Sequence, residues 1–518
     1  MSVSCTDCLI RCVSEETVRC FLRKSGFFSD ARGGRIISLF FSIRKINLKK
    51  GEIINRAPLL YNRIRSLFSL SLIKTFPIAV LLAFLSAGPL SATDYYVATS
   101  GNNQNPGTQN QPFRTVARGI NAARQPGDTV LIRAGIYSQS RTLNLANSGT
   151  EGRFITLKAF ENEEVIIDGS NLPEDATLIA VLAHHIRIQG LTVRNSQNIG
   201  ISIWGPGTRV HAVEVSGNRV HHCQNSGIYA GFNRLHDPVR DLLIADNIIS
   251  ECSLMNEGGR YNQWSFGAGA GLSRKVTIRN NTVSHCYGEG IGLYLSNKGT
   301  IEGNTVHDNF SVNIYLDNTT NTHVSRNLVY STEDQRFYRF NHPASGIQIA
   351  NENYQGFNNP SSHNVITNNI LIGNYIAISS GSYQRGGGLK HTLIANNTAW
   401  GSIGPLLNID ADSRHYKSRI SNNIFKQTGK IPLTDIQGST TQVEFSNNLW
   451  HGGVPQQSAR SASDLYADPL LVNGGTFNPE AYQLSESSPA RNAGIKLPEV
   501  ELDFNGKPRN NRINLGAW

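Results

Sequence analysis

Tyrosines, amides and a carboxylate recur in short segments in the middle of the chain, and their side chains could bind a sugar. The segments read GIYA (227–230), GIGLYL (290–295), NIYLDN (313–318), GIQIAN (346–351) and YIAISS (375–380). Side chains alternate between the two faces of a β-strand, so inward isoleucines leave the other positions facing outward. The polar and aromatic outward positions are then Tyr229, Tyr294, Asn313, Tyr315, Asp317 and Gln348. Aromatic rings beside polar tips suit a sugar chain, which stacks on the rings and hydrogen-bonds to the tips.

Longer segments flank these strands and would wall the outward face on both sides. Two precede the strands, at 253–266 and 332–344, and three follow them, at 231–241, 351–363 and 380–391. We therefore predict a cleft, because loops on a rigid scaffold are where function usually resides. The preceding loops add Arg260, Trp264, Arg336, Tyr338, Arg339 and His342. Arginine forks suit uronate carboxylates, so the expected ligand is an acidic polysaccharide. Alternatively, the outward tyrosines are ordinary cross-strand pairs on a sheet surface.

Two kinds of bond cleavage fit this set of residues. A lyase removes the proton next to a uronate carboxylate, so it needs a base and a group that neutralises the carboxylate. Tyr315, Tyr294 or His342 could be the base, and Asn313, Gln348 and Arg339 could neutralise the carboxylate.

A glycoside hydrolase instead needs two carboxyl groups across the scissile bond. Asp317 is the one carboxylate firmly placed on the outward face, and Glu289 is its nearest partner. Asp317 could also hold a calcium ion with Asn318 or Asp308, because hard cations take oxygen ligands. No other cofactor is indicated.

A repeat must position these residues. An apolar residue, small or polar residues, Asn, one residue and then an apolar residue recur as VTIRNNTV (276–283) and GTIEGNTV (299–306). The repeated asparagines are Asn218, Asn247, Asn281, Asn304, Asn327, Asn369, Asn397, Asn423 and Asn448, spaced 23 to 42 residues apart. Apolar residues alternate between them with strand periodicity. Units too short to bury a face alone must stack on each other, which predicts an all-β parallel β-helix of about ten or more coils.

The repeated asparagines have a structural explanation. Each stands where a strand ends, and Asn tolerates the left-handed conformation that turns need. Stacked coils are about 4.8 Å apart, so the amides are expected to form a ladder. Cys223, Cys252 and Cys286 each follow a repeated Asn by five residues. They are expected to fill one buried column as thiols, although neighbouring pairs would be close enough for disulfides.

The N-terminal residues 1–92 form an extension that ends like a secretory signal peptide. Basic residues precede an apolar run from Phe76 to Leu85, and small residues follow it up to Ala92. This segment holds 14 Lys and Arg against 5 Asp and Glu, whereas the rest of the chain holds 34 against 33. The net charge of +10 therefore indicates no nucleic-acid-binding surface. We expect a secreted, periplasmic or cell-surface protein with no membrane span after cleavage.

The region after the leader supplies a family resemblance. Residues 95–137 read YYVATSGNNQNPGTQNQPFRTVARGINAARQPGDTVLIRAGIY, in which 113–124 has apolar residues at helical spacing. This order and the later repeats resemble secreted right-handed parallel β-helix proteins of the pectate-lyase-like superfamily. The resemblance covers about residues 94–518 and implies right-handed coiling over 93–450, an N-terminal capping helix and a C-terminal cap at 451–518.

The resemblance does not extend to every motif of the family. The chain lacks the paired-Asp and GHG motifs of polygalacturonases and the arginine motif of the major pectate lyases. The expected function is binding of an acidic polysaccharide, with cleavage by β-elimination. The alternatives are a non-catalytic carbohydrate-binding or cell-surface protein and a glycoside hydrolase. A monomer is expected.

Overall fold

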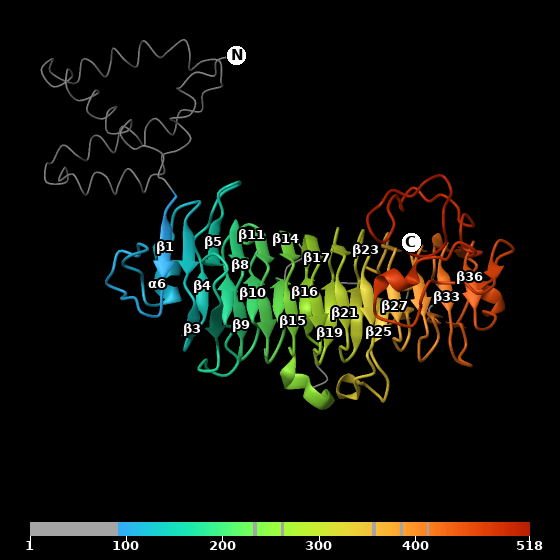
Figure 1. Ribbon diagram of the computed structural model, residues 1–518, viewed down its shortest axis with the longest axis horizontal. Coiled ribbons are helices and arrows are strands. Elements are labelled where there is room, and N and C mark those ends of the chain that lie inside the picture. The colour runs from blue at the N-terminus through green and yellow to red at the C-terminus, as the bar shows by residue number, and fades with distance from the viewer. Residues whose placement is uncertain (1–91, 232–235, 261–263, 355–358, 384–386, 412–413) are drawn as a thin grey trace, which may run out of the picture. The chain divides into compact units, whose positions relative to one another are not determined.

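The computed structural model describes residues 92–231, 236–260, 264–354, 359–383, 387–411 and 414–518 (Figure 1). The predicted extension and signal peptide at 1–92 lie outside this range except for Ala92. Parts of four predicted flanking loops also fall outside it. Within the described residues, no helix is long and apolar enough to cross a membrane.

The described chain winds into three long parallel sheets of 13, 11 and 13 strands, and a typical coil contributes one strand to each sheet. Sheet 1 contains β1 (Asp94–Val97), β2 (Thr129–Ile132), β5 (Ile155–Ala159), β8 (Ile186–Gln189), β11 (His211–Ser216), β14 (Val239–Ala245), β17 (Ser273–Arg279), β20 (Thr300–Glu302), β23 (His323–Ser325), β26 (Val365–Thr367), β29 (Leu393–Ala395), β32 (Ser418–Ser421) and β35 (Val443–Ser446). Sheet 2, which carries the predicted outward face, contains β4 (Leu143–Leu145), β7 (Ile179–Val181), β10 (Ile201–Trp204), β13 (Ile228–Gly231), β16 (Phe266–Gly271), β19 (Glu289–Tyr294), β22 (Val312–Asp317), β25 (Ser345–Asn351), β28 (Ile378–Ser382), β31 (Leu407–Ile409) and β34 (Thr434–Ile436). Sheet 3 contains β3 (Gly135–Ser138), β6 (Val165–Asp168), β9 (Thr192–Arg194), β12 (Arg219–His221), β15 (Ile248–Ser250), β18 (Thr282–Ser284), β21 (Thr305–His307), β24 (Leu328–Tyr330), β27 (Ile370–Ile372), β30 (Thr398–Trp400), β33 (Ile424–Lys426), β36 (Leu449–His451) and β37 (Leu465–Tyr466). The prediction of a parallel β-helix is therefore confirmed.

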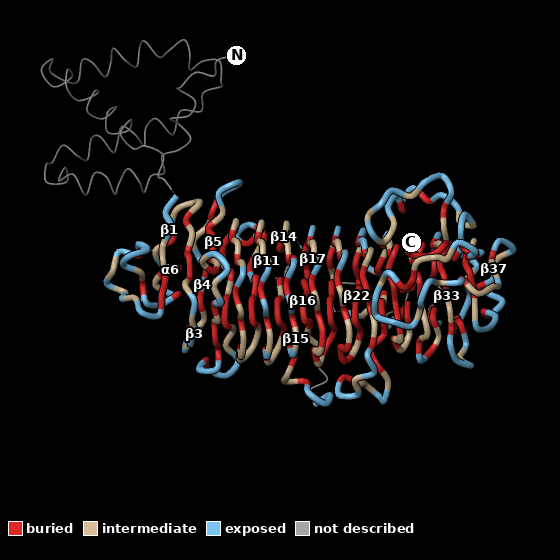
Figure 2. Tube along the Cα trace, viewed as in Figure 1, coloured by how far each residue is buried: buried red, intermediate tan, exposed pale blue. Residues whose placement is uncertain are grey.

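Successive coils stack in register, which places like residues above one another. In sheet 2, Ile291 pairs with Ile314, and Ile314 pairs with Ile347. All three side chains are fully buried in a continuous apolar core that runs along the interior of the coils (Figure 2). Stacking like on like removes the same apolar surface from water in every coil, so the repeat itself specifies the register.

The repeated asparagines form the expected ladder inside the turn between sheets 1 and 3. The Asn304 side-chain amide donates to Asn327 Oδ1 at 2.9 Å and to the Ile278 carbonyl at 3.0 Å, and the same contacts recur in other coils. The left-handed residue, however, is the one before each repeated Asn, such as Asn280 or Arg326. The repeated Asn instead bonds inward, because its amide satisfies backbone groups that no strand reaches.

The buried column after the ladder holds Cys223, Cys252 and Cys286, all as free thiols. Their side chains are completely buried. The prediction of small buried thiols is confirmed, and the disulfide alternative is wrong for this column.

Each end of the stack is covered by a different segment. Helix α6 (Val116–Ala122) lies against β1, β2 and β4 and buries Val116 and Ile120 in the core. At the other end, β37 pairs with β36. Four short 3₁₀ helices occur in the described loops: Leu254–Gly259, Gln335–Phe337, Gln457–Ala459 and Pro479–Tyr482.

The C-terminal segment then runs back along the coils. Tyr482 and Ala517 pack on Leu328, Ile370 and Ile372 of β24 and β27. The segment thus covers apolar side chains on the outer side of sheet 3 as well as the last coil.

Candidate functional site

The outer side of sheet 2 brings most of the predicted face residues onto neighbouring coils. Tyr315 pairs with Gln348 of β25, and Tyr294 pairs with Asp317 of β22. Tyr229 lies on β13, two coils before Tyr294, and its hydroxyl is 2.6 Å from that of Tyr294. We call the outer side of sheet 2 from β10 to β28, with the loop side chains that contact it, the sheet-2 face.

Glycines form the floor of the sheet-2 face and allow aromatic rings to lie flat on it. A Cβ atom at Gly292 would lie 1.9 Å from Phe266 Cε1, and one at Gly271 would lie 2.1 Å from Tyr294 Cζ. The rings of Phe266 and Tyr294 therefore occupy the space that side chains at these positions would fill. The two rings stack with centroids 6.3 Å apart.

Further rings extend this arrangement along the coils. Tyr354 stacks on Tyr294 with centroids 6.1 Å apart, and Trp204 lies 6.4 Å from Tyr229. Trp204 is 43% exposed, so this end of the row is open to a ligand. A row of rings running across several coils matches the extended shape of a polysaccharide.

Asp317 lies on the outer side of sheet 2 but is completely buried. Its Oδ1 accepts the backbone N–H of Glu352 at 3.0 Å, and its Oδ2 accepts the Tyr354 hydroxyl. The loop after β25 therefore covers this carboxyl group, and burial raises the pKa of Asp317 to about 6. Alternation alone predicted an open carboxylate here.

Tyr315 is coupled to the same loop. Its hydroxyl donates to Glu352 Oε1 at 2.9 Å. Burial, together with the charges of Asp317 and Glu352, raises the pKa of Tyr315 well above its usual value. Tyr315 therefore keeps its proton at neutral pH and points it at a carboxylate.

Glu289 is a second buried acid at the edge of the face. It is 4% exposed, and its Oε2 has no hydrogen-bond partner. Burial raises the pKa of Glu289 to about 8; the Arg339 charge opposes this rise, whereas Asp317 and Glu352 add to it. Glu289 is thus a protonated carboxylic acid at neutral pH, which could donate a proton.

Asn313 does not lie on the outer face. Its side chain is completely buried, accepts from Asn309 Nδ2 at 2.9 Å and donates to Asn374 Oδ1 at 3.0 Å. Asn309 and Asn374 stand five residues after a repeated Asn, in the column that holds the cysteines. Two successive residues at the start of β22 face inward because the chain turns a corner there, so the predicted role of Asn313 in neutralising a substrate is wrong.

The arginines and Trp264 from the preceding loops separate into two groups. The Arg339 guanidinium lies 4.2 Å from the centre of the Trp264 ring and donates to Ser311 Oγ at 3.1 Å. Arg336 is exposed and pairs with Asp334 of its own loop, and Arg260 is exposed on the other loop. Of the three predicted arginines, Arg339 is the one whose charge affects the pKa of Glu289.

His342 and Gln348 have defined partners. The His342 ring stacks on Tyr375 with centroids 3.6 Å apart, and its Nδ1 donates to the Pro343 carbonyl at 2.9 Å. Gln348 donates to the Tyr383 hydroxyl at 3.4 Å.

The oxygen ligands predicted for calcium lie in two places. Asp308 follows β21 of sheet 3, where it accepts from Thr332 and pairs with His307, so it cannot act with Asp317. Asn318 does lie beside Asp317, and its amide donates to the Glu352 carbonyl at 3.0 Å. Its Oδ1 is buried without a partner, so a hard-oxygen donor set of Asp317, Asn318 and Glu352 remains compatible with Ca²⁺.

Glu352 and Tyr354 were not predicted as site residues, although Glu352 left a signal in the sequence. Gln348 and Ala350 face outward on β25, and alternation continued by two residues reaches Glu352. The composition of the segment NENYQGFNNPSSH (351–363) instead predicts a flanking loop. Tyr354 has no comparable signal, because its contact with Asp317 depends on how the loop folds back.

A cavity of about 600 Å³ lies beside the same loop. It is lined by Thr320, Asn359, Pro360, Ser362, His363, Lys390, His391, Arg414, His415 and Tyr416. None of these lining residues is acidic, and two of them, Lys390 and Arg414, are basic. The loop that covers Asp317 therefore also contributes to a basic cavity next to the face.

The β-helix is similar to known proteins in both sequence and structure. Residues 95–288 match the family model described as Pel9A-like, right handed beta helix region, and residues 262–398 match that of Periplasmic copper-binding protein (NosD). The structure of pectate lyase Pel9A superposes with a TM-score of 0.51 at 18% identity, covering 83% of this chain and 97% of that one. The complex of XylC with xylose superposes with a TM-score of 0.56 at 13% identity, covering 82% and 98%.

Three relatives share sequence with the chain. The uncharacterized protein YwoF of Bacillus subtilis is 28% identical over 479 residues, which span 80% of this chain and 96% of that protein. Pectate lyase PEL9 of Emericella nidulans is 34% identical over 82 residues, 16% of this chain and 20% of that enzyme. Pectate lyase L of Paenibacillus polymyxa is 31% identical over 146 residues, 27% and 31%. The in-register coils, the buried asparagine ladder and these matches agree: the chain is a right-handed parallel β-helix protein, and its residues 95–288 are similar to the Pel9A-like family.

Proposed function

We propose that the sheet-2 face binds an acidic polysaccharide and cleaves it by β-elimination. The observation that carries the proposal is the Tyr315–Glu352 pair, set in a row of aromatic rings on a floor of glycines. The pectate lyases of Emericella nidulans and Paenibacillus polymyxa, which match parts of this chain, support the reaction class.

Two features favour an acidic substrate. Arg339 lies flat on Trp264 at the edge of the face, where its fork could pair with a uronate carboxylate. The cavity lined by Lys390 and Arg414 adds positive charge beside the loop that carries Glu352. A chain lying across the coils would meet the rings first and these cations at its carboxylate groups.

The elimination needs a base and an acid. A base takes the proton from the carbon next to the uronate carboxylate, the electron pair forms a carbon–carbon double bond, and the glycosidic oxygen leaves with a proton. The raised pKa of Tyr315 suits the acid that protonates the leaving oxygen. Glu352, which accepts the Tyr315 proton in a hydrogen bond, suits the base.

Hydrolysis is the second candidate, and Glu289 is the observation that favours it. A buried carboxyl group with a pKa of about 8 is a general acid, and Asp317 and Glu352 are close enough to influence its charge. One of these would then serve as the nucleophile or general base. This pair of roles needs no proton removal from a sugar carbon.

Calcium would act at the same carboxylates. Asp317 and Asn318 would hold the ion and leave Glu352 available as the base, and a bound cation would neutralise the uronate carboxylate and acidify the neighbouring C–H. Export of the chain after cleavage of the leader is part of the proposal and is checked by sequencing the N-terminus of the exported protein.

The experiment incubates the protein with pectate, alginate and glycosaminoglycans, with added Ca²⁺ and with chelator. Absorbance near 235 nm, new reducing ends and binding are measured together. Elimination predicts rising absorbance, which Tyr315→Phe should lower by about a hundredfold or more. Tyr466→Phe, an exposed tyrosine on β37, is the matched control.

The other results separate the alternatives. Reducing ends without absorbance, abolished in Glu289→Gln, would replace elimination by hydrolysis. Binding without either product would identify a carbohydrate-binding protein. Full activity in both Tyr315→Phe and Asp317→Asn would remove the reaction from this face.

A further inference from the structure

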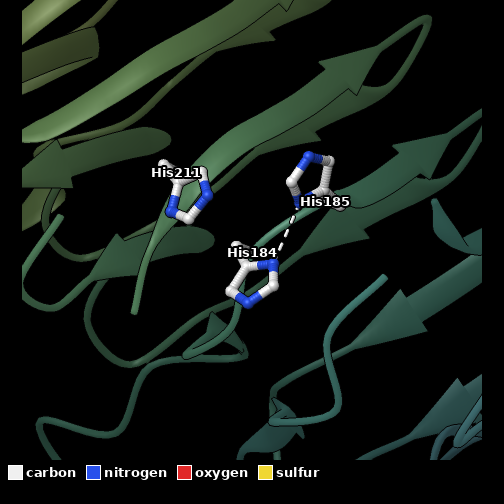
Figure 3. Close-up of side chains that lie close together, drawn as sticks. All are labelled: His184, His185 and His211. Carbon is white, nitrogen blue, oxygen red and sulfur yellow. Dashed lines mark hydrogen bonds between the residues drawn. The ribbon is translucent and has the colours of Figure 1, made fainter. Parts of the chain in front are cut away.

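Three histidines meet where the chain passes from sheet 2 to sheet 1 near the N-terminal end of the described coils. His184 and His185 precede β8, and His211 begins β11 of the next coil (Figure 3). Their backbones are joined, since the His185 N–H donates to the His211 carbonyl at 3.1 Å. One ring nitrogen from each residue lies within 4.8 Å of the other two.

We propose that His184, His185 and His211 bind one divalent transition-metal ion of the zinc class. Imidazole nitrogens are preferred ligands for such ions. Ligands 2.0–2.1 Å from a tetrahedral ion lie about 3.3 Å from each other. His184 Nδ1 and His185 Nδ1 are already 2.9 Å apart. The His211 ring stacks on the His184 ring with centroids 4.7 Å apart, so one of these two rings must rotate to direct its nitrogen at the same ion.

The hydrogen bonds leave the necessary lone pairs available. His211 Nδ1 lies 3.0 Å from the Gly207 carbonyl, which only accepts, so Nδ1 carries the proton and Nε2 presents its lone pair. A carbonyl held by the second ring nitrogen is the usual support of a metal-bound histidine. His184 and His185 share a single hydrogen bond between their Nδ1 atoms, which an ion would replace.

One cation lies near the three histidines. The Arg240 guanidinium would oppose a bound metal ion, but it pairs with Asp241 at 2.8 Å. Three protein ligands leave the remaining positions of the ion to water.

Two other groups of metal-type ligands among the described residues are less suitable. Asp308 beside His285 and His307 is engaged by the backbone and hydroxyl of Thr332. The group of His221, His222 and Glu251 is a surface cluster, since the His222 and Glu251 side chains are 48% and 49% exposed.

The proposal is tested by titrating the full chain with ZnCl₂ and with CoCl₂ in a calorimeter and a spectrometer. The expected result is a zinc-binding event that His211→Ala and His184→Ala each weaken at least about tenfold. Zinc should also raise the melting temperature of the wild-type chain, because the ion joins two coils. His222→Ala is the matched control and should leave the event unchanged.

The variants differ from the wild type at one residue each, so zinc bound at other sites contributes equally to all of them. Circular dichroism establishes that each variant remains folded. Equal zinc affinity and stoichiometry in the wild type, His184→Ala and His211→Ala would overturn the site. Loss of the event in His222→Ala alone would do so as well.

Discussion

Burial of single side chains decides the chemistry available on the sheet-2 face. Glu289 and Asp317 are both enclosed, and the pKa of each is raised, to about 8 and about 6. Tyr315 responds to the same environment by holding its proton more tightly. A face with one protonated acid, one protonated tyrosine and a partly exposed Glu352 can both donate and accept protons at neutral pH.

The raised pKa of Glu289 makes a prediction about stability. Below its ordinary pKa of 4.5 the carboxyl group is neutral in both the folded and the unfolded chain, so its burial costs nothing extra. As the pH rises toward 8, the unfolded chain loses the proton first and becomes favoured. Glu289→Gln should therefore melt at the same temperature as the wild type near pH 4.5 and at increasingly higher temperature than the wild type toward pH 8. The corresponding gain in the free energy of unfolding is a few kcal/mol at most.

Differential scanning calorimetry across this pH range measures the difference. Glu444→Gln replaces an exposed glutamate on β35 and should give a constant difference from the wild type. Parallel curves for Glu289→Gln and the wild type would show that Glu289 is not a buried neutral acid.

At the scale of elements, the strands of sheet 2 set where the rings lie. Gly271 on β16 has no side chain, and the Tyr294 ring of β19 fills the space in front of it. A Cβ at this position faces the ring on the outer side of the sheet, whereas the neighbouring Ala270 lies in the core. The floor of glycines is thus a positioning device for the aromatic row.

Replacing that glycine should displace the ring without unfolding the chain. In Gly271→Ala the new Cβ would meet Tyr294 Cζ at 2.1 Å, so the ring must move, which disturbs the contact between its hydroxyl and that of Tyr229. Polysaccharide affinity should fall about twofold to tenfold, because a stacked ring contributes about 0.5–1.5 kcal/mol. Isothermal titration with the bound polysaccharide measures the loss.

Gly429→Ala is the control for this prediction. Gly429 is exposed, and a Cβ there would meet only Ile431 at ordinary contact distance. Affinity should stay at the wild-type value. If Gly271→Ala also binds normally, the Tyr294 ring does not contact the ligand.

At the scale of the whole molecule, the C-terminal segment is fastened by residues next to the asparagine ladder. The Asn368, Asn396 and Asn422 side chains donate to carbonyls of residues 495–516. Arg509 is half-buried in the same region, where it donates to Asn368 Oδ1 at 2.7 Å and to the carbonyls of Gly516 and Ala517 at 2.9 Å. The returning segment is therefore held by one partly buried cation.

Arg509→Ala should release that segment from the coils. The substitution leaves several carbonyl groups without a donor, at about 1–3 kcal/mol each when they are buried. Limited proteolysis with mass spectrometry should show new cleavage within residues 485–518 while the coils stay intact. Arg512→Ala, at an exposed position in the same segment, should leave the cleavage pattern unchanged. Equal protection in both variants would show that Arg509 does not hold the segment.

The sequence by itself determined the coil. Spaced asparagines such as Asn281, Asn304 and Asn327 and the isoleucines Ile291 and Ile314 repeat with the coil, and in-register stacking turns that repeat into columns. Periodicity is a local property of the chain, so it can be recognised from the sequence alone. It also placed Tyr315 and Gln348 on adjacent strands of one sheet.

The tertiary structure alone decided which of these side chains are enclosed. Alternation along the strand predicts that Asn313 and Asp317 both face outward. In the structure, a corner of the coil turns Asn313 into the core. The loop after β25 covers Asp317 with Glu352 and Tyr354. The three histidines likewise meet only when the coils stack. Burial depends on how corners and inserted loops pack in space, which the spacing of residues along the chain does not encode.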